Sequence, residues 1–159
     1  MDIVLRTAEH GDIPRLVQLW NELMDHHAAI DPYFQKSEVG PVNFERFVSS
    51  LILLEDSRVL VAQDGGVVVG YCIGQVMTRP PVFKMEVHGF ITDMTVTASY
   101  RRCGVGTRLL AGMLEWFDAK RIDRVELNVV PGNVAGVSFW RKQGFRDYMH
   151  VLYRERGQG

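Results

Sequence analysis

The stretch Met94–Thr107 constrains the fold more than any other part of this chain. It joins a β-like run to an amphipathic helix through the pattern Arg101-x-x-Gly104-x-Gly106. The first backbone N–H groups of a helix have no intrahelical partner, and the helix macrodipole favours an anion at that end. Glycines carry no Cβ, so a phosphate group can approach their backbone closely. The pattern therefore predicts a strand–loop–helix unit that binds a phosphorylated ligand.

Length and composition narrow the class of protein. A chain of 159 residues has the size of one domain, so we expect a single domain over residues 1–159. The net charge of -1 argues against a nucleic-acid partner, which would require a basic face. No apolar run is long enough to span a membrane, so no membrane partner is expected. The only cysteines, Cys72 and Cys103, form no disulfide framework, and with no signal peptide they favour a cytoplasmic location.

Apolar spacing and turn residues predict an ordered series of elements. The predicted strands are Ile3–Arg6, Arg58–Gln63, Val67–Met77, Met85–Thr97, Arg124–Val130 and Phe145–Arg154. The predicted helices are Asp12–Asp25, Asn43–Leu54, Gly106–Lys120 and Asn133–Gln143. This order predicts an α/β (α+β) fold, in which helices pack on the faces of a mixed sheet.

Two common nucleotide-binding patterns fail on individual residues. A Rossmann fingerprint would place a third glycine where Leu109 stands, and it would follow the first strand of the chain. A P-loop requires Gly-Lys-Ser/Thr, but Gly106 is followed by Thr107 and Arg108. The phosphorylated ligand must therefore be held by another kind of loop.

The loop resembles the GNAT superfamily of acetyl-CoA-dependent N-acetyltransferases. The family signature Q/R-x-x-G-x-G/A is matched by Arg101-Arg102-Cys103-Gly104-Val105-Gly106. The preceding residues are similar to the family's V-x-P-x-Y-R, with Ala98 in the place of proline. A second motif, N-x-x-A-x-x-L/F-Y-x-x-x-G-F, is similar to the segment Asn133–Phe145. The motifs occur in the family's order, and the resemblance covers nearly the whole chain.

The resemblance implies both the fold and the donor site. The implied sheet is mixed and mostly antiparallel, has about six to seven strands, is splayed at strands 4 and 5, and is flanked by about four helices. The pantetheine arm of acetyl-CoA would lie in the splay and pair with strand backbone. The residues implied for cofactor binding are Met94, Val96, Arg101, Arg102, Gly104, Val105, Gly106, Thr107, Asn133 and Trp140.

Trp140 stands where the family usually has a tyrosine that acts as general acid. An indole N–H can donate a hydrogen bond but cannot act as an acid near neutral pH. Either coenzyme A leaves as a thiolate and is protonated by solvent, or another hydroxyl serves. The alternative hydroxyls are those of Ser138, Tyr148 and Tyr153.

The sequence leaves the general base open among three residues of the predicted fourth strand, Met85–Thr97. Asp93 is the acidic residue nearest the splay, and Glu86 or His88 acting through a water are the alternatives. In a regular strand Glu86 and His88 share one face and Asp93 points to the other. A bulge near the splay would shift this parity, so the parity does not exclude Asp93.

The acceptor amine is expected opposite the cofactor, beside the connection between the first two helices. His27, Tyr33 and Phe34 lie in that connection, and Phe83 lies on the other candidate wall. Aromatic side chains could hold an ammonium group by cation–π contact. The adjacent pair His26-His27 faces two directions on a helix and has no partner cluster, so no metal is expected.

Together these features predict transfer of an acetyl group from acetyl-CoA to a primary amine of a small molecule or peptide. The alternatives are an acyl-CoA-binding regulatory domain with weak or no catalysis, and an acetyltransferase of protein lysines or N-termini. The resemblance also implies a homodimer.

Overall fold

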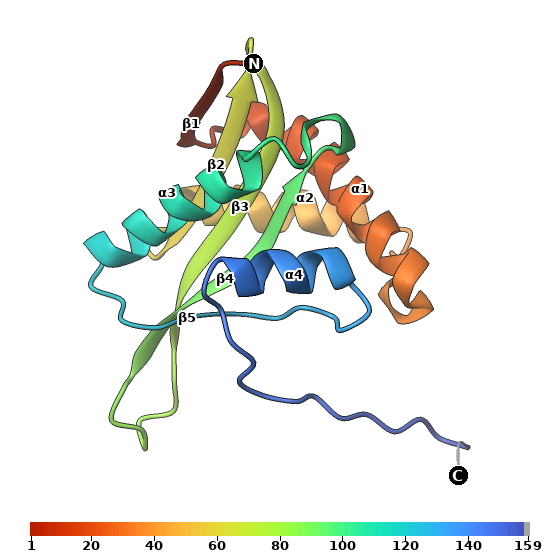
Figure 1. Ribbon diagram of the computed structural model, residues 1–159, viewed down its shortest axis with the longest axis vertical. Helices are drawn as coiled ribbons and strands as arrows, with labels where there is room; N and C mark the ends of the chain where they lie inside the picture. Colours follow the sequence, from red (N-terminus) through yellow and green to blue (C-terminus); the bar gives the residue numbers. More distant parts are fainter. Residues whose placement is uncertain (158–159) are drawn as a thin grey trace. The chain divides into compact units, whose positions relative to one another are not determined.

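The computed structural model describes residues 1–157, and its elements follow the predicted order as far as the fourth helix (Figure 1). The strands are β1 (Ile3–Thr7), β2 (Ser57–Asp64), β3 (Val67–Thr78), β4 (Val87–Val96) and β5 (Val125–Leu127). The α-helices are α1 (Ile13–Ile30), α2 (Gly40–Leu53), α3 (Val105–Ala119) and α4 (Val134–Lys142). Short 3-10 turns are η1 (His10–Asp12), η2 (Pro32–Phe34) and η3 (Ala98–Tyr100).

The sheet is mixed and mostly antiparallel, with the strand order β1-β2-β3-β4-β5. Each pair of neighbours is antiparallel except β4 and β5, which are parallel. The predicted architecture is thus confirmed, but the described residues form five strands rather than six to seven. The predicted strand Phe145–Arg154 is wrong, because a strand requires a ladder partner and no described residue after Leu127 has one.

Two compact units make up the chain, one over Met1–Asn128 and a second that begins at Val129. The first unit contains the whole sheet and the helices α1 to α3. The second contains α4 and an extended segment in which large apolar side chains are exposed. These exposed side chains are Tyr148, Met149, Val151, Leu152 and Tyr153.

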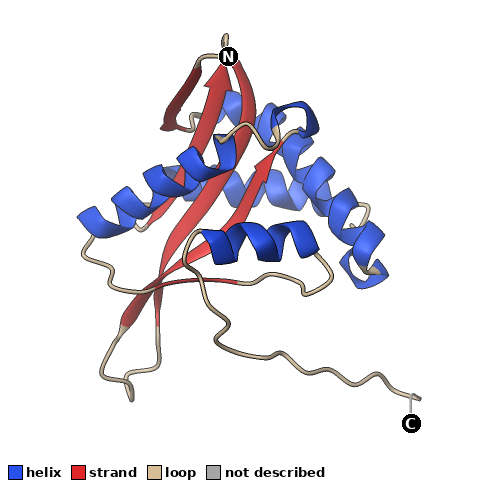
Figure 2. Ribbon diagram, viewed as in Figure 1, coloured by secondary structure: helices blue, strands red, loops and turns tan. Residues whose placement is uncertain are grey.

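Helices cover both faces of the sheet in the first unit, with α3 in front and α1 and α2 behind (Figure 2). The helices α1 and α2 bury one apolar cluster with β2 and β3, which includes Tyr71 and Ile73. On the other face, α3 lies so close to the sheet that two strand positions hold glycine. A Cβ at Gly74 would lie 2.3 Å from the sulfur of Met113, and a Cβ at Gly89 would lie 2.6 Å from the ring of Phe117.

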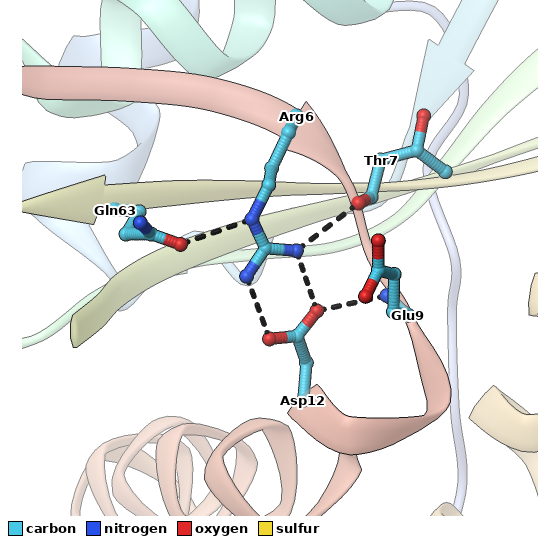
Figure 3. Close-up of polar contacts among 5 residues, drawn as sticks. All are labelled: Arg6, Thr7, Glu9, Asp12 and Gln63. Atoms are coloured by element: carbon cyan, nitrogen blue, oxygen red, sulfur yellow. Dashed lines mark hydrogen bonds and ion pairs between the residues drawn. The ribbon is translucent and has the colours of Figure 1, made fainter. Parts of the chain in front are cut away.

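A polar network ties the first strand to the start of α1 (Figure 3). The Arg6 guanidinium donates two hydrogen bonds to the Asp12 carboxylate, at 2.7 and 2.8 Å, and one to Gln63 Oε1 of β2 at 2.9 Å. The Asp12 carboxylate also accepts from the backbone N–H of Glu9 at 2.8 Å. The hydrogen bonds from Arg6 are the main cause that lowers the pKa of Asp12. Asp12 therefore orients the helix through the arginine, and its side chain makes no cap hydrogen bond.

Candidate active site

The strand β4 has a free edge where its pairing with β5 stops. The parallel ladder covers only Gly89–Ile91 of β4, against Val125–Leu127. From Thr92 to Val96, no described residue pairs with β4 on this side, while the pairing with β3 continues. This is the splay predicted between strands 4 and 5.

A bulge lies at the point where the splay begins. Ile73 of β3 is opposite Asp93, but the next residue, Gly74, is opposite Ile91, so Thr92 is the extra residue. A bulge of this kind turns the following residues to the other face. Asp93 consequently shares the face of Ile73, whose side chain packs in the cluster under α1 and α2. A regular strand would have pointed Asp93 toward α3.

The bulge also decides which backbone groups of β4 point to the free edge. The N–H of Thr97 donates to the carbonyl of Val69, so Thr97 faces β3. Because the hydrogen-bonding direction alternates along a strand, Met94 and Val96 present their N–H and C=O groups to the free edge. The Val96 carbonyl already accepts a hydrogen bond from Arg101 Nε at 2.9 Å.

Asp93 is a half-buried carboxylate with no partner among the described residues. It makes no hydrogen bond or ion pair with any residue in the range 1–157. Burial raises the pKa of Asp93 to about 6. The group is still mostly ionised at neutral pH, yet it holds a proton far more readily than an exposed aspartate, which are the two properties of a general base.

The other two candidate bases lie apart from Asp93. Glu86 is exposed and precedes β4, where its carbonyl accepts from the Arg79 N–H at 2.7 Å. His88 lies five residues before Asp93, roughly 15 Å along the strand. Its Nε2 is 3.6 Å from Glu126 of β5, and its buried Nδ1 has no hydrogen-bond partner among the described residues.

The loop after β4 presents a row of free backbone donors. Gly104 caps α3 with a left-handed backbone, φ +81°, and Arg102 also has a positive φ of 60°. The backbone N–H groups from Gly104 to Thr107 donate to no acceptor within residues 1–157. The side chain of Arg102 is exposed. Successive free N–H groups at a helix N-terminus form a concave site for an anion.

The second motif forms a cap and an aromatic cluster within the second unit. Asn133 caps α4, and its side-chain oxygen accepts from the Gly136 N–H at 3.1 Å. Trp140 packs edge-to-face on Phe139 and Phe145, with ring centroids 5.0 and 5.4 Å away. Both residues have these local structural roles, whatever their role toward a cofactor.

Three of the four predicted acceptor residues lie together, and the fourth does not. His27 and Tyr33 each pack against Phe34, with centroids 5.8 and 5.9 Å apart. Burial lowers the pKa of His27, so it is neutral at neutral pH. Phe83 instead packs on Arg79, 4.1 Å from its guanidinium, in the hairpin between β3 and β4. That hairpin projects from the end of the sheet away from α3 (Figure 1).

Two further polar groups, one beside Asp93 and one at the end of β4, were not expected from the sequence. Tyr71 of β3 is fully buried, and its hydroxyl has no hydrogen-bond partner in the described residues. Glu22 of α1 accepts a hydrogen bond from the Thr97 hydroxyl at 3.0 Å, just beyond β4. Neither residue belongs to a motif. In the sequence, Tyr71 is an ordinary strand residue and Glu22 an ordinary residue of an amphipathic helix, so no signal marks them.

No three or more His, Cys, Asp or Glu side chains in residues 1–157 gather as a metal ion would require. No helix in that range is both long and apolar enough to cross a membrane.

Comparison with known proteins gave consistent matches. The model of the acetyltransferase (GNAT) family matches residues 17–145. The L-amino acid N-acetyltransferase of Escherichia coli (strain K12) is 28% identical over 145 residues, covering 91% of this chain and 83% of that protein. The L-2,4-diaminobutyric acid acetyltransferase of Shouchella clausii (strain KSM-K16) is 36% identical over 87 residues, covering 55% of this chain and 46% of that protein.

A solved structure agrees in fold. The predicted acetyltransferase from Clostridium acetobutylicum, solved with acetyl-CoA, superimposes with a TM-score of 0.79 at 19% identity. The match covers 97% of this chain and 96% of that one.

Proposed function

Because this chain belongs to the acetyltransferase (GNAT) family, we propose that it transfers the acetyl group of acetyl-CoA to a primary amine of a small molecule or peptide. The observation that carries this proposal is the free edge of β4 leading directly into the free N–H groups at the start of α3. An amide-containing arm can pair with such an edge like an added strand. A pyrophosphate attached to that arm would then reach a helix N-terminus, which suits its charge.

The donor would be held mainly by backbone. Met94 and Val96 would pair with the pantetheine arm, and Gly104 to Thr107 would bind the pyrophosphate through N–H groups. Arg101 and Arg102 would add positive charge. Arg101 already bonds to the Val96 carbonyl, so we propose that its Nη atoms, rather than Nε, face the phosphates. By their match to the second motif, Asn133 and Trp140 are further candidates for cofactor binding, and the acetyltransferase domain would extend over residues 1–159.

Asp93 would serve as the general base. An alkylamine with a pKa of about 10.4 is neutral in only about one molecule in 10³ near pH 7, so a proton must be removed before attack. Asp93 takes that proton, the neutral nitrogen forms a bond to the thioester carbon, and the carbon–sulfur bond breaks to release coenzyme A as a thiolate. The nitrogen loses a second proton to solvent as the amide forms. Because Trp140 cannot donate a proton, the thiolate takes its proton from solvent.

The relatives point to small amines as acceptors. The two named relatives act, by their names, on L-amino acids and on L-2,4-diaminobutyric acid. His27, Tyr33 and Phe34 form the aromatic wall that we propose for the acceptor. The test is release of coenzyme A from acetyl-CoA with a panel of L-amino acids, L-2,4-diaminobutyric acid, aminoglycosides and lysine peptides. Turnover with a small amine supports the proposal, and turnover with peptides alone would favour a protein acetyltransferase.

Trp140 favours one competing function, an acyl-CoA-binding domain with little catalysis, since the usual acid is absent at that position. The same panel separates the two functions. Tight binding of acetyl-CoA by calorimetry, without release of coenzyme A for any amine, would favour the binding domain.

We further propose that the protein is a homodimer. The segment 148–153 exposes five large apolar side chains, with exposed fractions from 62% for Tyr148 to 90% for Leu152. An exposed apolar stretch of this kind commonly marks an interface between chains. Light scattering after size exclusion tests this, because charged substitutions at Val151 and Leu152 should then yield a monomer.

We also propose a cytoplasmic location, which the two free cysteines support.

A further inference from the structure

Tyr71 is a core residue whose hydroxyl has no role in the core. Its side chain is 0% exposed, and the hydroxyl has no hydrogen-bond partner within residues 1–157. Buried tyrosine hydroxyls nearly always have a partner, because an unpaired buried donor costs free energy. A phenylalanine would fill the same apolar space without that cost. The hydroxyl therefore requires an explanation other than packing.

The register of the sheet places Tyr71 beside Asp93. Tyr71 is opposite Thr95 of β4, and Ile73 is opposite Asp93. Residues two apart on a strand share a face, so Tyr71 and Asp93 lie on the same face of neighbouring strands. Such diagonal neighbours are about 7 to 8 Å apart in a sheet. The bulge at Thr92 produces this placement, since a regular strand would have turned Asp93 away.

The two groups are complementary and otherwise unpartnered. The phenol is a donor, the carboxylate is an acceptor, and neither bonds to another described residue. Burial first, and the charge of Asp93 second, raise the pKa of Tyr71, so the phenol keeps its proton at any working pH. Of the elements packed on this face, α1 brings Glu22, which is engaged by Thr97, and α2 brings the apolar ring of Phe44.

We propose that Tyr71 is a positioning residue for the proton transfer that Asp93 carries out. The Tyr71 hydroxyl donates a hydrogen bond to a water molecule, and that water donates to the Asp93 carboxylate. The acceptor ammonium donates to the same water. As a proton of the ammonium moves to the water oxygen, another proton of that water moves to Asp93. The products are a neutral amine and a carboxylic acid. Tyr71 is unchanged by the step, and its role is to hold the water in line.

This inference rests on the proposed function, in which Asp93 is the base, and a double-mutant cycle separates the two. The variants are Tyr71→Phe, Asp93→Asn and the double variant, assayed with acetyl-CoA and the most active amine of the panel. We expect Tyr71→Phe to lower kcat/KM about tenfold, a part of what base catalysis contributes. In the Asp93→Asn background the same change should have less than a twofold effect, because the two residues act through one proton path.

Two measurements separate a positioning role of Tyr71 from a purely structural one. They are the pH profile of kcat/KM and a titration of Asp93 in the ligand-free protein. Tyr71→Phe releases the water that donates to the ionised Asp93 carboxylate, and losing that donor raises the pKa of Asp93. The acid limb of kcat/KM should therefore shift to higher pH. The ¹³C carboxyl signal of Asp93, identified by its loss in Asp93→Asn, should shift likewise in the free protein. Phe44→Leu is the packing control, because it disturbs the ring 6.2 Å from Tyr71 and keeps the hydroxyl. It should lower stability without moving the limb.

Two outcomes would overturn the role of Tyr71, and a third would overturn the role of Asp93 as the base. If Tyr71→Phe leaves both kcat/KM and the Asp93 titration within error of the wild type, the inference is overturned while Asp93 remains the base. An equal loss in the presence and absence of Asp93 would show a structural effect and would also overturn it. If Asp93→Asn itself keeps full activity and the acid limb, the base assignment in the proposed function fails instead.

Discussion

Replacing Asp93 by asparagine should make the protein more stable while it removes catalysis. The carboxylate has an ordinary pKa of 3.8 and a pKa of about 6 in the folded chain, because burial disfavours its charge. Ionisation at neutral pH is therefore harder in the folded state than in the unfolded state. The ratio of the two ionisation constants is about 10², which corresponds to ~3 kcal/mol of lost stability at pH 7.

The pH dependence follows from the sign of this shift. Between about pH 4 and pH 6 the folded state binds more protons at Asp93 than the unfolded state, so this group's contribution to stability falls as the pH rises through that window. Above about pH 6 ionisation of Asp93 lowers the stability by the full amount, and below about pH 4 it no longer lowers the stability. Asparagine removes the charge but buries an amide without a partner. That burial costs about 1 kcal/mol and reduces the gain in stability by this amount.

Thermal unfolding followed by calorimetry measures the effect. A net gain of about 2 kcal/mol corresponds to a rise in Tm of roughly 4 to 8 °C at pH 7 for a chain of this size. The gain should shrink toward zero near pH 4. Asp123→Asn is the matched control, since Asp123 is exposed and makes no described contact. An Asp93→Asn protein that is no more stable than wild type at pH 7, or whose advantage does not depend on pH, would refute this reasoning.

Three further outcomes are expected. Gly70→Ala should destabilise the sheet by about 1 to 3 kcal/mol, because its Cβ would lie 2.8 Å from the Thr95 backbone oxygen, and urea unfolding measures this. Asp12→Asn should lose stability near pH 7 but not near pH 2, because the lowered pKa of Asp12 contributes only while the group is ionised; an equal loss at both values would contradict the pairing with Arg6. Trp140→Tyr should raise kcat if proton donation to the leaving thiolate limits the rate, and an unchanged kcat in steady-state assays would show that it does not.

The first unit was largely predictable because its signals are local. The apolar period of α3 and the turn at Asp64-Gly65-Gly66 each act within a few residues, so the strands and helices around them were expected in the correct order. Helix ends were less accurate. The helix α1 continues to Ile30 rather than Asp25, because nothing breaks it before Pro32. The last strand failed because strand formation depends on a distant partner, which local alternation does not specify.

The free backbone donors of the candidate site were predictable from the sequence, but the face of the sheet that Asp93 occupies was not. The glycine pattern indicated the free N–H groups of the loop, since glycine at +81° is required there. Which face Asp93 occupies depends on one extra residue in a ladder, and only the bulge was foreseen as an alternative. Tyr71 was missed because burial of a tyrosine is ordinary, and the missing partner of its hydroxyl is visible only in three dimensions.

The extra residue at Thr92 connects the two parts of the proposed site, the edge of β4 for the donor and Asp93 as the base. Deleting it would return Asp93 to the α3 face and would also exchange the backbone groups that Met94 and Val96 turn to the free edge. Deletion of this one residue would thus disturb the proposed donor pairing and the proposed placement of the base together. A substitution in β4 can change the proposed donor pairing or the proposed base placement alone. An insertion or deletion in β4 changes both. Variation in chain length compatible with the chemistry is therefore confined to the loops, where it can alter acceptor preference and leave the donor end intact.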